Sequence, residues 1–215
     1  MAEAYSAGFA FIVEGDTEKE FYLSLLNFLC KKYNAQIERL INGTTPDVIY
    51  VITLSDKQEL VKFHTVNTIT QLPRAGKWFN SQCLSKHQKK LPWHVFLCYD
   101  TDKYTDDISK FHEGDWENLE RDLKRATVLH IAAAADIEDI MLLDIKGICD
   151  FISCDVPETL AGRKGKVKLR NLYRDHQTAY HAGKRARPLI DSLDMQLIID
   201  TASIPLKEIE KLMFK

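Results

Sequence analysis

The sequence predicts an α/β fold in which a mainly parallel sheet is flanked by helices. Three observations predict it: apolar runs of strand length alternate with segments of helical periodicity, turn residues separate them, and acidic residues follow three of the apolar runs. The chain has 215 residues, of which 45% are hydrophobic and 28% charged. This composition is typical of a globular protein with a buried core. The formal net charge of -2 excludes a uniformly basic, DNA-coating protein.

The first half of the chain is expected to open with a strand, a tight turn and a helix. Residues 8–13 (GFAFIV) form an apolar run, and Thr17 with Glu20 three positions later is typical of a helix capping box. Apolar side chains at helical spacing then predict a helix over 18–32. Later patterns predict a strand over 36–41, a hairpin of 48–54 with 60–64, and a helix over 77–87.

In the second half of the chain, predicted strands again alternate with predicted helices, and a segment rich in basic residues follows them. The run WHVFLCY at 93–99 predicts a buried strand. The elements expected after it are a polar loop over 106–115, a helix over 116–125, a strand over 128–133, a helix over 136–151 and two short helices after 188. We therefore expect a sheet domain over 1–156, and a basic loop with a helical extension over 157–215 that packs on the same domain.

Acidic side chains follow three predicted strands. Glu14 follows the first, Asp100 and Asp102 follow the buried run, and Glu138 follows the last. Ligands of open α/β sheets bind outside the carboxyl ends of the strands, and strand periodicity places Asp100 and Asp102 on one side. Glu18, one helical turn after Glu14, can face the same crevice. Because clustered carboxylates repel each other, the pattern predicts bound Mg²⁺ or Mn²⁺, with room for a second cation.

Each acid also has an ordinary interpretation. Glu18 and Asp136 stand where an acid stabilises a helix start, and a D-x-D pair is common in turns. The combination of E-G-x-T-E after one strand and D-x-D after another favours the metal site over these separate explanations.

Two motifs resemble a known family. FIVEGDTE at 11–18 and LCYDTD at 97–102 together resemble the TOPRIM fold, a Rossmann-like sheet, and are most similar to the compact prokaryotic nucleases of the OLD and RloB-like groups. AAAADIEDIMLLD at 132–144 is similar to the later acidic segment of RloB-like proteins, in which Glu138 is the matching acid. The resemblance covers roughly residues 8–145.

The resemblance implies a metal-dependent endonuclease that cuts phosphodiester bonds in DNA or RNA, with a role in phage defence. In this interpretation Glu14, Asp100 and Asp102 hold the principal cation, while Glu18 and Glu138 help to hold a second. Lys166 lies near the scissile phosphate, with Lys164 and Lys168 as rivals. A partner ATPase of the OLD type would be a separate chain, and a homo-oligomer is the other expectation.

A basic segment follows residue 162. The segment 162–170 combines two glycines with five cations, which suits phosphate contact, and aromatic residues such as Tyr173 and Tyr180 are placed to stack on bases. The expected nucleic-acid contacts are Arg163, Lys164, Lys168, Arg170, Lys184 and Arg185. The alternatives are a solvated loop beside a basic helix and, for the whole protein, a non-catalytic module that binds nucleic acid or a partner chain.

Cysteine usage and hydropathy predict a cytoplasmic protein. The five cysteines are irregularly spaced without a C-x-x-C pair, which argues against a zinc site or a disulfide framework. The first residues lack the pattern of a secretory signal, and no apolar run is long enough to span a membrane.

Overall fold

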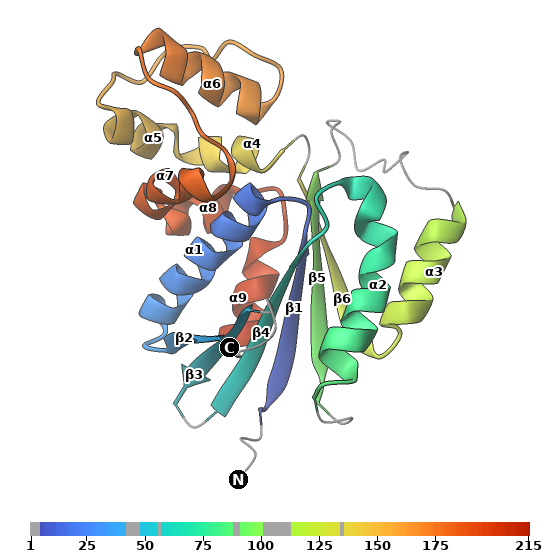
Figure 1. Cartoon of the computed structure of the whole chain (residues 1–215). Coiled ribbons are helices and arrows are strands. Elements are labelled where there is room, and N and C mark those ends of the chain that lie inside the picture. The colour runs from blue at the N-terminus through green and yellow to red at the C-terminus, as the bar shows by residue number, and fades with distance from the viewer. Residues whose placement is uncertain (1–4, 42–47, 56, 88–90, 101–112, 134–135) are drawn as a thin grey trace.

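A computed structural model describes residues 5–41, 48–55, 57–87, 91–100, 113–133 and 136–215 of the chain (Figure 1). In these residues, six strands form one sheet in the order β2-β3-β4-β1-β5-β6. The strands are β1 (Ala7–Val13), β2 (Gln36–Ile41), β3 (Val48–Leu54), β4 (Lys57–Thr65), β5 (Trp93–Asp100) and β6 (Ala126–Ala133). The four strands from β4 to β6 run parallel, and the β2-β3-β4 segment is antiparallel. The predicted mostly parallel α/β sheet and its hairpin are confirmed.

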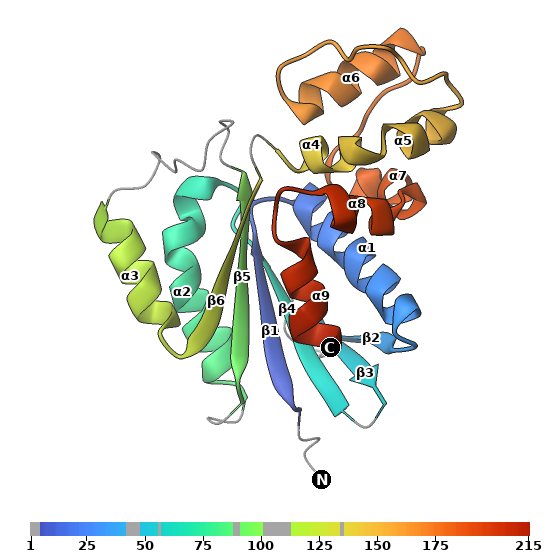
Figure 2. The same ribbon diagram turned by 180° about the vertical axis from the view of Figure 1, so that it is seen from behind.

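Helices cover both faces of this sheet (Figures 1 and 2). They are α1 (Asp16–Lys32), α2 (Ala75–Trp78), α3 (Glu113–Leu123), α4 (Ile137–Met141), α5 (Ile145–Ile152), α6 (Gly165–Asp175), α7 (Arg187–Ser192), α8 (Met195–Thr201) and α9 (Leu206–Phe214). Shorter turns are η1 (Ile69–Arg74), η3 (Leu142–Asp144) and η4 (Gly183–Ala186), and η2 (Phe79–Leu84) is a π-type segment.

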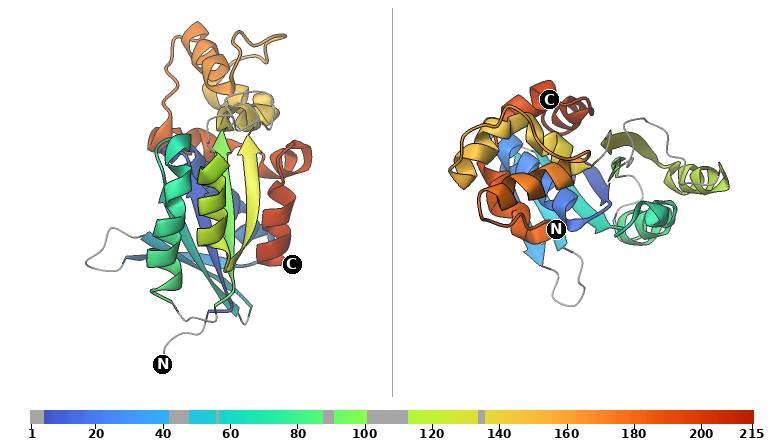
Figure 3. Two further views of the ribbon diagram at one scale, coloured as in Figure 1. Left: turned by 90° about the vertical axis from the view of Figure 1, so that its right-hand side faces the viewer. Right: turned by 90° about the horizontal axis from the view of Figure 1, so that it is seen from above.

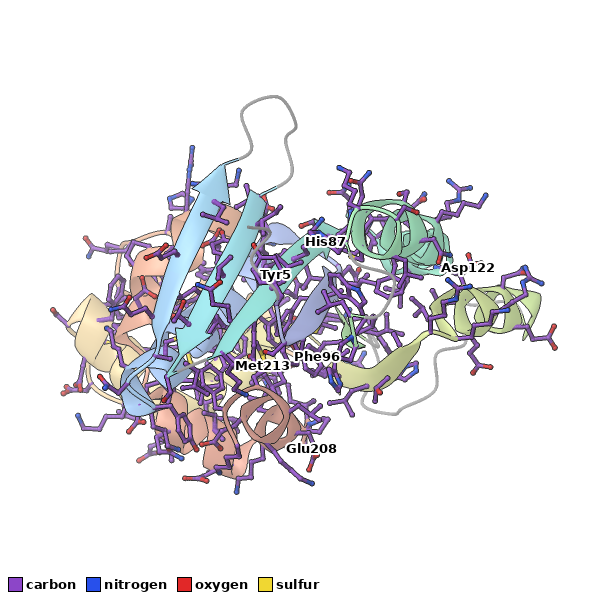
Figure 4. All side chains as sticks on the ribbon, turned by 90° about the horizontal axis from the view of Figure 1, so that it is seen from below. Tyr5, His87, Phe96, Asp122, Glu208 and Met213 are labelled. Atoms are coloured by element: carbon purple, nitrogen blue, oxygen red, sulfur yellow. The ribbon has the colours of Figure 1, made fainter. Side chains whose placement is uncertain are left out.

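Strand periodicity divides the core into two layers. Phe9 and Phe11 of β1 pack with α1 and with the helices from α4 to α9, whereas Ala10 and Ile12 pack with η1, α2, η2 and α3. Figure 3 shows the sheet between α2 on one side and α9 on the other. Seen from below in Figure 4, Phe96 and Met213 are labelled residues of the first layer.

The carboxy-terminal helices belong to that first layer. Buried residues of α5, α6, α7 and α9 share one hydrophobic cluster with β1 and β5. In Figures 1 and 3, α5 and α6 rise beyond the carboxyl end of the sheet. The division of the chain at residue 156 stays a prediction.

Three helix predictions differ from the structure. The helix expected over 77–87 is one turn of α2 followed by η2, because Ser81 and Ser85 donate their hydroxyls to the carbonyls of Trp78 and Asn80. The helix expected over 136–151 restarts at Asp144, whose carboxylate accepts from Gly147 N at 2.9 Å. Three helices rather than two follow residue 187 in the described chain.

No described helix combines the length and the apolar character that a membrane crossing requires. The predicted cytoplasmic location stays a prediction.

Candidate functional site

A pocket of about 550 Å³ lies at the carboxyl ends of β1 and β5. Acidic and basic side chains from four parts of the chain line it. The acids are Glu14, Asp16, Glu18, Asp100, Asp136 and Glu138, and the bases are Lys164, Lys166 and Arg170. All of the predicted metal ligands except Asp102 therefore meet here, and Asp102 lies outside the described residues.

Parallel pairing of β1 with β5 brings Glu14 to Asp100. Val13 is the register partner of Cys98, so the two strands end side by side. The backbone N–H of Asp100 donates to Glu14 Oε2 at 3.3 Å. Residues 86 positions apart thus share one edge of the pocket.

Asp100 is the most strongly perturbed acid of the pocket. Burial, followed by the negative charges of Glu18 and Glu14, raises the pKa of Asp100 to about 10. Its Oδ1 is buried and has no hydrogen-bond partner among the described residues. A buried carboxylate oxygen without a donor is costly, so this atom is ready to accept a ligand of positive charge.

Glu18 lies in the first turn of α1 and is 7% exposed. Burial raises its pKa to about 7, the carboxylates of Glu138 and Glu14 add to the rise, and a backbone hydrogen bond and Lys166 oppose it. The prediction that Glu18 faces the acidic crevice therefore agrees with its position.

The predicted capping box of α1 is wrong. Gly15 is the N-cap and makes no side-chain cap bond, while Thr17 Oγ1 accepts a hydrogen bond from Gly183 N at 2.8 Å. Thr17 instead joins the start of α1 to the first residue of η4.

Tyr180 holds Glu138 in place. Its hydroxyl donates to Glu138 Oε1 at 2.9 Å, and Glu138 is 3% exposed. Burial and then the charge of Asp136 raise the pKa of Glu138. Burial and the Glu138 carboxylate likewise raise the pKa of Tyr180, so its phenol stays a donor. The prediction that the Tyr180 ring stacks on a base is wrong, because the ring is 9% exposed and its hydroxyl is engaged.

Asp136 caps two helices at once. Its Oδ1 accepts from Asp139 N at the start of α4, and its Oδ2 accepts from Lys166 N at the start of α6, both at 3.1 Å. A Cβ on Gly165 would lie 2.1 Å from Asp139 N, so only glycine permits this approach. Residues 165–170 of the segment expected as a loop form the first turns of α6, whereas 162–164 precede the helix, and phosphate contact by this segment stays a prediction.

The predicted basic contacts fall into three groups. Lys164, Lys166 and Arg170 line the pocket, and Lys168 Nζ pairs with Asp139 Oδ1 at 3.0 Å. The remaining residues are exposed away from the pocket lining: Arg163, Lys184 and Arg185. Nucleic-acid contact by any of them stays a prediction.

The pocket contains no ready-made metal cage. Among the described residues, no three His, Cys, Asp or Glu side chains are arranged to hold a metal ion. Mg²⁺ often takes only one or two carboxylates and fills its remaining positions with water and substrate oxygens. The donor set, made of carboxylate oxygens, and the unsatisfied Oδ1 of Asp100 fit a hard cation held in this way.

No family model and no curated protein match the sequence. Two solved structures are similar to the chain. The first is a futalosine hydrolase mutant of Helicobacter pylori strain 26695, with 8% identity over 92% of this chain and 99% of that chain, and a TM-score of 0.27. The second is the Campylobacter jejuni 5'-methylthioadenosine/S-adenosyl homocysteine nucleosidase, with 13% identity over 95% and 99%, and a TM-score of 0.29.

The prediction of a TOPRIM nuclease of the OLD or RloB-like group is wrong. No family model supports it, and the two structures are named a futalosine hydrolase and a nucleosidase rather than nucleases. The predicted role in phage defence falls with it, and the alternative of a non-catalytic TOPRIM module has no better support. Because the TM-scores of these two structures are so low, their activities are not assigned to this chain.

Proposed function

We propose that the chain is a hydrolase that binds Mg²⁺ or Mn²⁺ in the acidic pocket and acts on a small, phosphate-bearing substrate. The single observation that carries this proposal is the buried Oδ1 of Asp100, which lies among the carboxylates of Glu14 and Glu18 and has no hydrogen-bond partner within the described part of the chain. Burial and then the repulsion between carboxylates raise the pKa values of Asp100 and Glu18, and a divalent cation would offset both effects.

The basic side chains support the choice of a phosphate group. Lys164, Lys166 and Arg170 line the same pocket as the acids, and an anion held by them would face the cation. The volume of about 550 Å³ lies within the usual range for small-molecule sites, which favours a small substrate over a polymer.

The chain's own residues have separate parts in this proposal. A bound cation supplies Lewis-acid polarisation of the phosphate and a more acidic water. Lys166, whose backbone N–H is fixed by Asp136, presents a positive charge to the substrate phosphate. Glu138, fixed by Tyr180, is the candidate to accept a proton from the attacking water.

Calorimetric titration with Mg²⁺ and Mn²⁺ tests the binding step. We expect Asp100→Asn and Glu18→Gln each to weaken cation binding by about tenfold or more, since each removes a negative oxygen from the pocket. Glu208→Gln on α9 is the matched control, because Glu208 pairs with Lys211 outside the pocket, and it should bind as the wild type does.

A phosphate-release assay on p-nitrophenyl phosphate, pyrophosphate and nucleoside phosphates tests the chemical step. Activity should require added cation and fall with Asp100→Asn. Equal cation affinity in wild type and Asp100→Asn would overturn the proposal. So would cleavage that persists in EDTA, including release of p-nitrophenol from a p-nitrophenyl riboside, which would indicate cation-independent glycosidic hydrolysis.

A further inference from the structure

The end of α5 folds into a Schellman motif. Ser153 adopts the left-handed conformation with φ 59° and ψ 50°. Ser153 N donates to Asp150 O at 3.3 Å, and Cys154 N donates to Cys149 O at 2.9 Å. These two bonds return the chain onto the last turn of the helix, and they bring the side chains of the first and last residues of the motif together.

Those two residues are both cysteines. An apolar contact between these two positions often accompanies the motif, whereas here both positions carry a thiol. Cys149 is fully buried and Cys154 is half-buried, and both line a surface cavity of about 510 Å³ that also contains Ser153 and His176.

The other three thiols are placed differently. Cys30 lies in α1, Cys83 in η2 and Cys98 in β5, and all three are buried in separate elements. A soluble oxidant therefore meets Cys154 first. A metal at the paired thiols is not proposed, because no three metal-ligating side chains are suitably arranged in the described residues.

We propose that Cys149 and Cys154 are a site of reversible oxidative modification, which a peroxide closes to an intramolecular disulfide. The site is independent of the acidic pocket and of the function proposed for that pocket.

The chemistry needs only the two thiols and one peroxide. The Cys154 thiol releases its proton, and the thiolate attacks one oxygen of hydrogen peroxide. The O–O bond breaks, Cys154 becomes a sulfenic acid, and the departing hydroxide takes up the released proton and leaves as water. The Cys149 sulfur then attacks the sulfenic sulfur, and its proton leaves with the hydroxyl group as a second water. Two thiols are oxidised and one peroxide is reduced to two waters.

Burial determines the order of these steps. Burial and then the neighbouring Cys154 thiol raise the pKa of Cys149 to about 11, and the carboxylates of Asp150 and Asp155 add to the rise. Cys149 therefore stays a thiol until the sulfenic acid forms beside it, and it serves as the resolving residue.

Peptide mapping after oxidation tests the proposal on the full-length protein. Hydrogen peroxide is added to the native protein, remaining thiols are alkylated after unfolding, and the chain is cut with trypsin. Both cysteines fall in one peptide, Gly147–Arg163, because trypsin cuts after Lys146 and Arg163. We expect this peptide to be two hydrogens lighter and unalkylated, with all five thiols restored by dithiothreitol.

Variants make the outcome decisive. Cys154→Ser changes a half-buried residue and should abolish the disulfide while Cys149 remains alkylatable, whereas Cys30→Ser should leave disulfide formation unchanged. Cys149→Ala, checked for folding by circular dichroism, should accumulate the sulfenic acid on Cys154. The proposal is overturned if the wild-type peptide carries sulfinic Cys154 with alkylated Cys149, or if the disulfide joins another pair.

Discussion

Tyr180 and Glu138 show how a single side chain fixes part of the pocket. The two residues are 42 positions apart, with Glu138 in α4 and Tyr180 between α6 and η4, yet their hydroxyl and carboxylate meet at 2.9 Å. The sequence contains no local pattern that would pair them. The acids themselves were predictable, because the carboxyl ends of parallel strands meet at one edge of a sheet.

Tyr180→Phe removes only this hydroxyl. We expect a loss of about 1–2 kcal/mol in the free energy of unfolding, since a buried carboxylate oxygen loses its donor. Urea denaturation of the two proteins measures the difference. Tyr173→Phe is the matched control, because Tyr173 is a buried ring in contact with Tyr180 on the same side of the molecule. Equal losses in the two variants would show that the hydroxyl of Tyr180 contributes nothing specific.

His87 makes stability depend on pH. Burial, followed by the charges of Lys62 and Lys86, lowers the pKa of His87 from 6.5 to about 4. Its ring meets Tyr5 edge-on at 6.4 Å, both residues being labelled in Figure 4, and its Nε2 has no hydrogen-bond partner among the described residues. The folded protein keeps His87 neutral, whereas the unfolded chain protonates it more readily. Between pH 6.5 and about 4 the unfolded chain therefore binds more protons than the folded protein does.

The free energy of unfolding should therefore fall as the pH is lowered from 6.5 towards 4. The stability that neutral His87 contributes should be fully present above pH 6.5. His87→Gln should reduce the change in the free energy of unfolding between pH 6.5 and 4 by on the order of 1 kcal/mol, an amount discounted for the partial exposure of His87. Urea denaturation at several pH values measures it. The exposed His181→Gln variant should keep the wild-type slope. An unchanged slope in His87→Gln would contradict the prediction.

Among the helices and strands, the sequence pattern predicted those whose formation depends on side chains within the same segment. The helical periodicity of α1 lies within its own segment, and the pairing of β3 with β4 follows from two apolar runs separated by a short polar stretch, so both were predictable. The break at Asp144 was not, because an aspartate inside an apolar helical pattern gives no sign that its carboxylate will cap a new helix. Short acidic motifs likewise suggested a family that the comparisons do not support, since such motifs occur on many folds.

Gly165 determines how closely α6 approaches α4. Gly165→Ala would place a Cβ 2.1 Å from Asp139 N and 2.4 Å from Glu138 C, both backbone atoms that cannot rotate away. We expect a loss of about 1–3 kcal/mol in the free energy of unfolding, together with weaker cation binding, because the helices must separate. Chemical denaturation and calorimetry measure the two effects.

Arg174→Ala is the control within the same helix, because Arg174 is exposed and its Nε lies 3.7 Å from Asp175 Oδ1, which is a long and solvated ion pair. It should change stability by less than about 0.5 kcal/mol. A Gly165→Ala protein as stable as the wild type would show that α4 and α6 are less tightly packed than the structure indicates.

For the whole molecule, the first core layer joins the start and the end of the chain. Phe11 of β1, Ile148 of α5 and Ile209 of α9 belong to one buried cluster. Such continuity favours a single cooperative unfolding transition, even though the sequence changes character near residue 157.

Ile209→Ala tests this cooperativity. The side chain is fully buried, so we expect a cost of about 2–5 kcal/mol. In a background with Trp78→Phe and Trp116→Phe, fluorescence of Trp93 in β5 reports on the sheet, and far-ultraviolet circular dichroism reports mainly on the helices. Both signals should shift together to lower urea concentration. A shift of the helical signal alone would indicate that the carboxy-terminal helices unfold as a separate unit.

The shared cap at Asp136 has a mechanical consequence. Since one carboxylate begins both α4 and α6, the two helices form a single rigid piece, and Glu138 and Lys166 are carried by it together. An incoming molecule therefore meets a negative and a positive group whose spacing is set in advance. The pocket would then select molecules whose charged groups have the same spacing as Glu138 and Lys166. Movement of one helix alone could not adapt the pocket to a molecule with a different spacing.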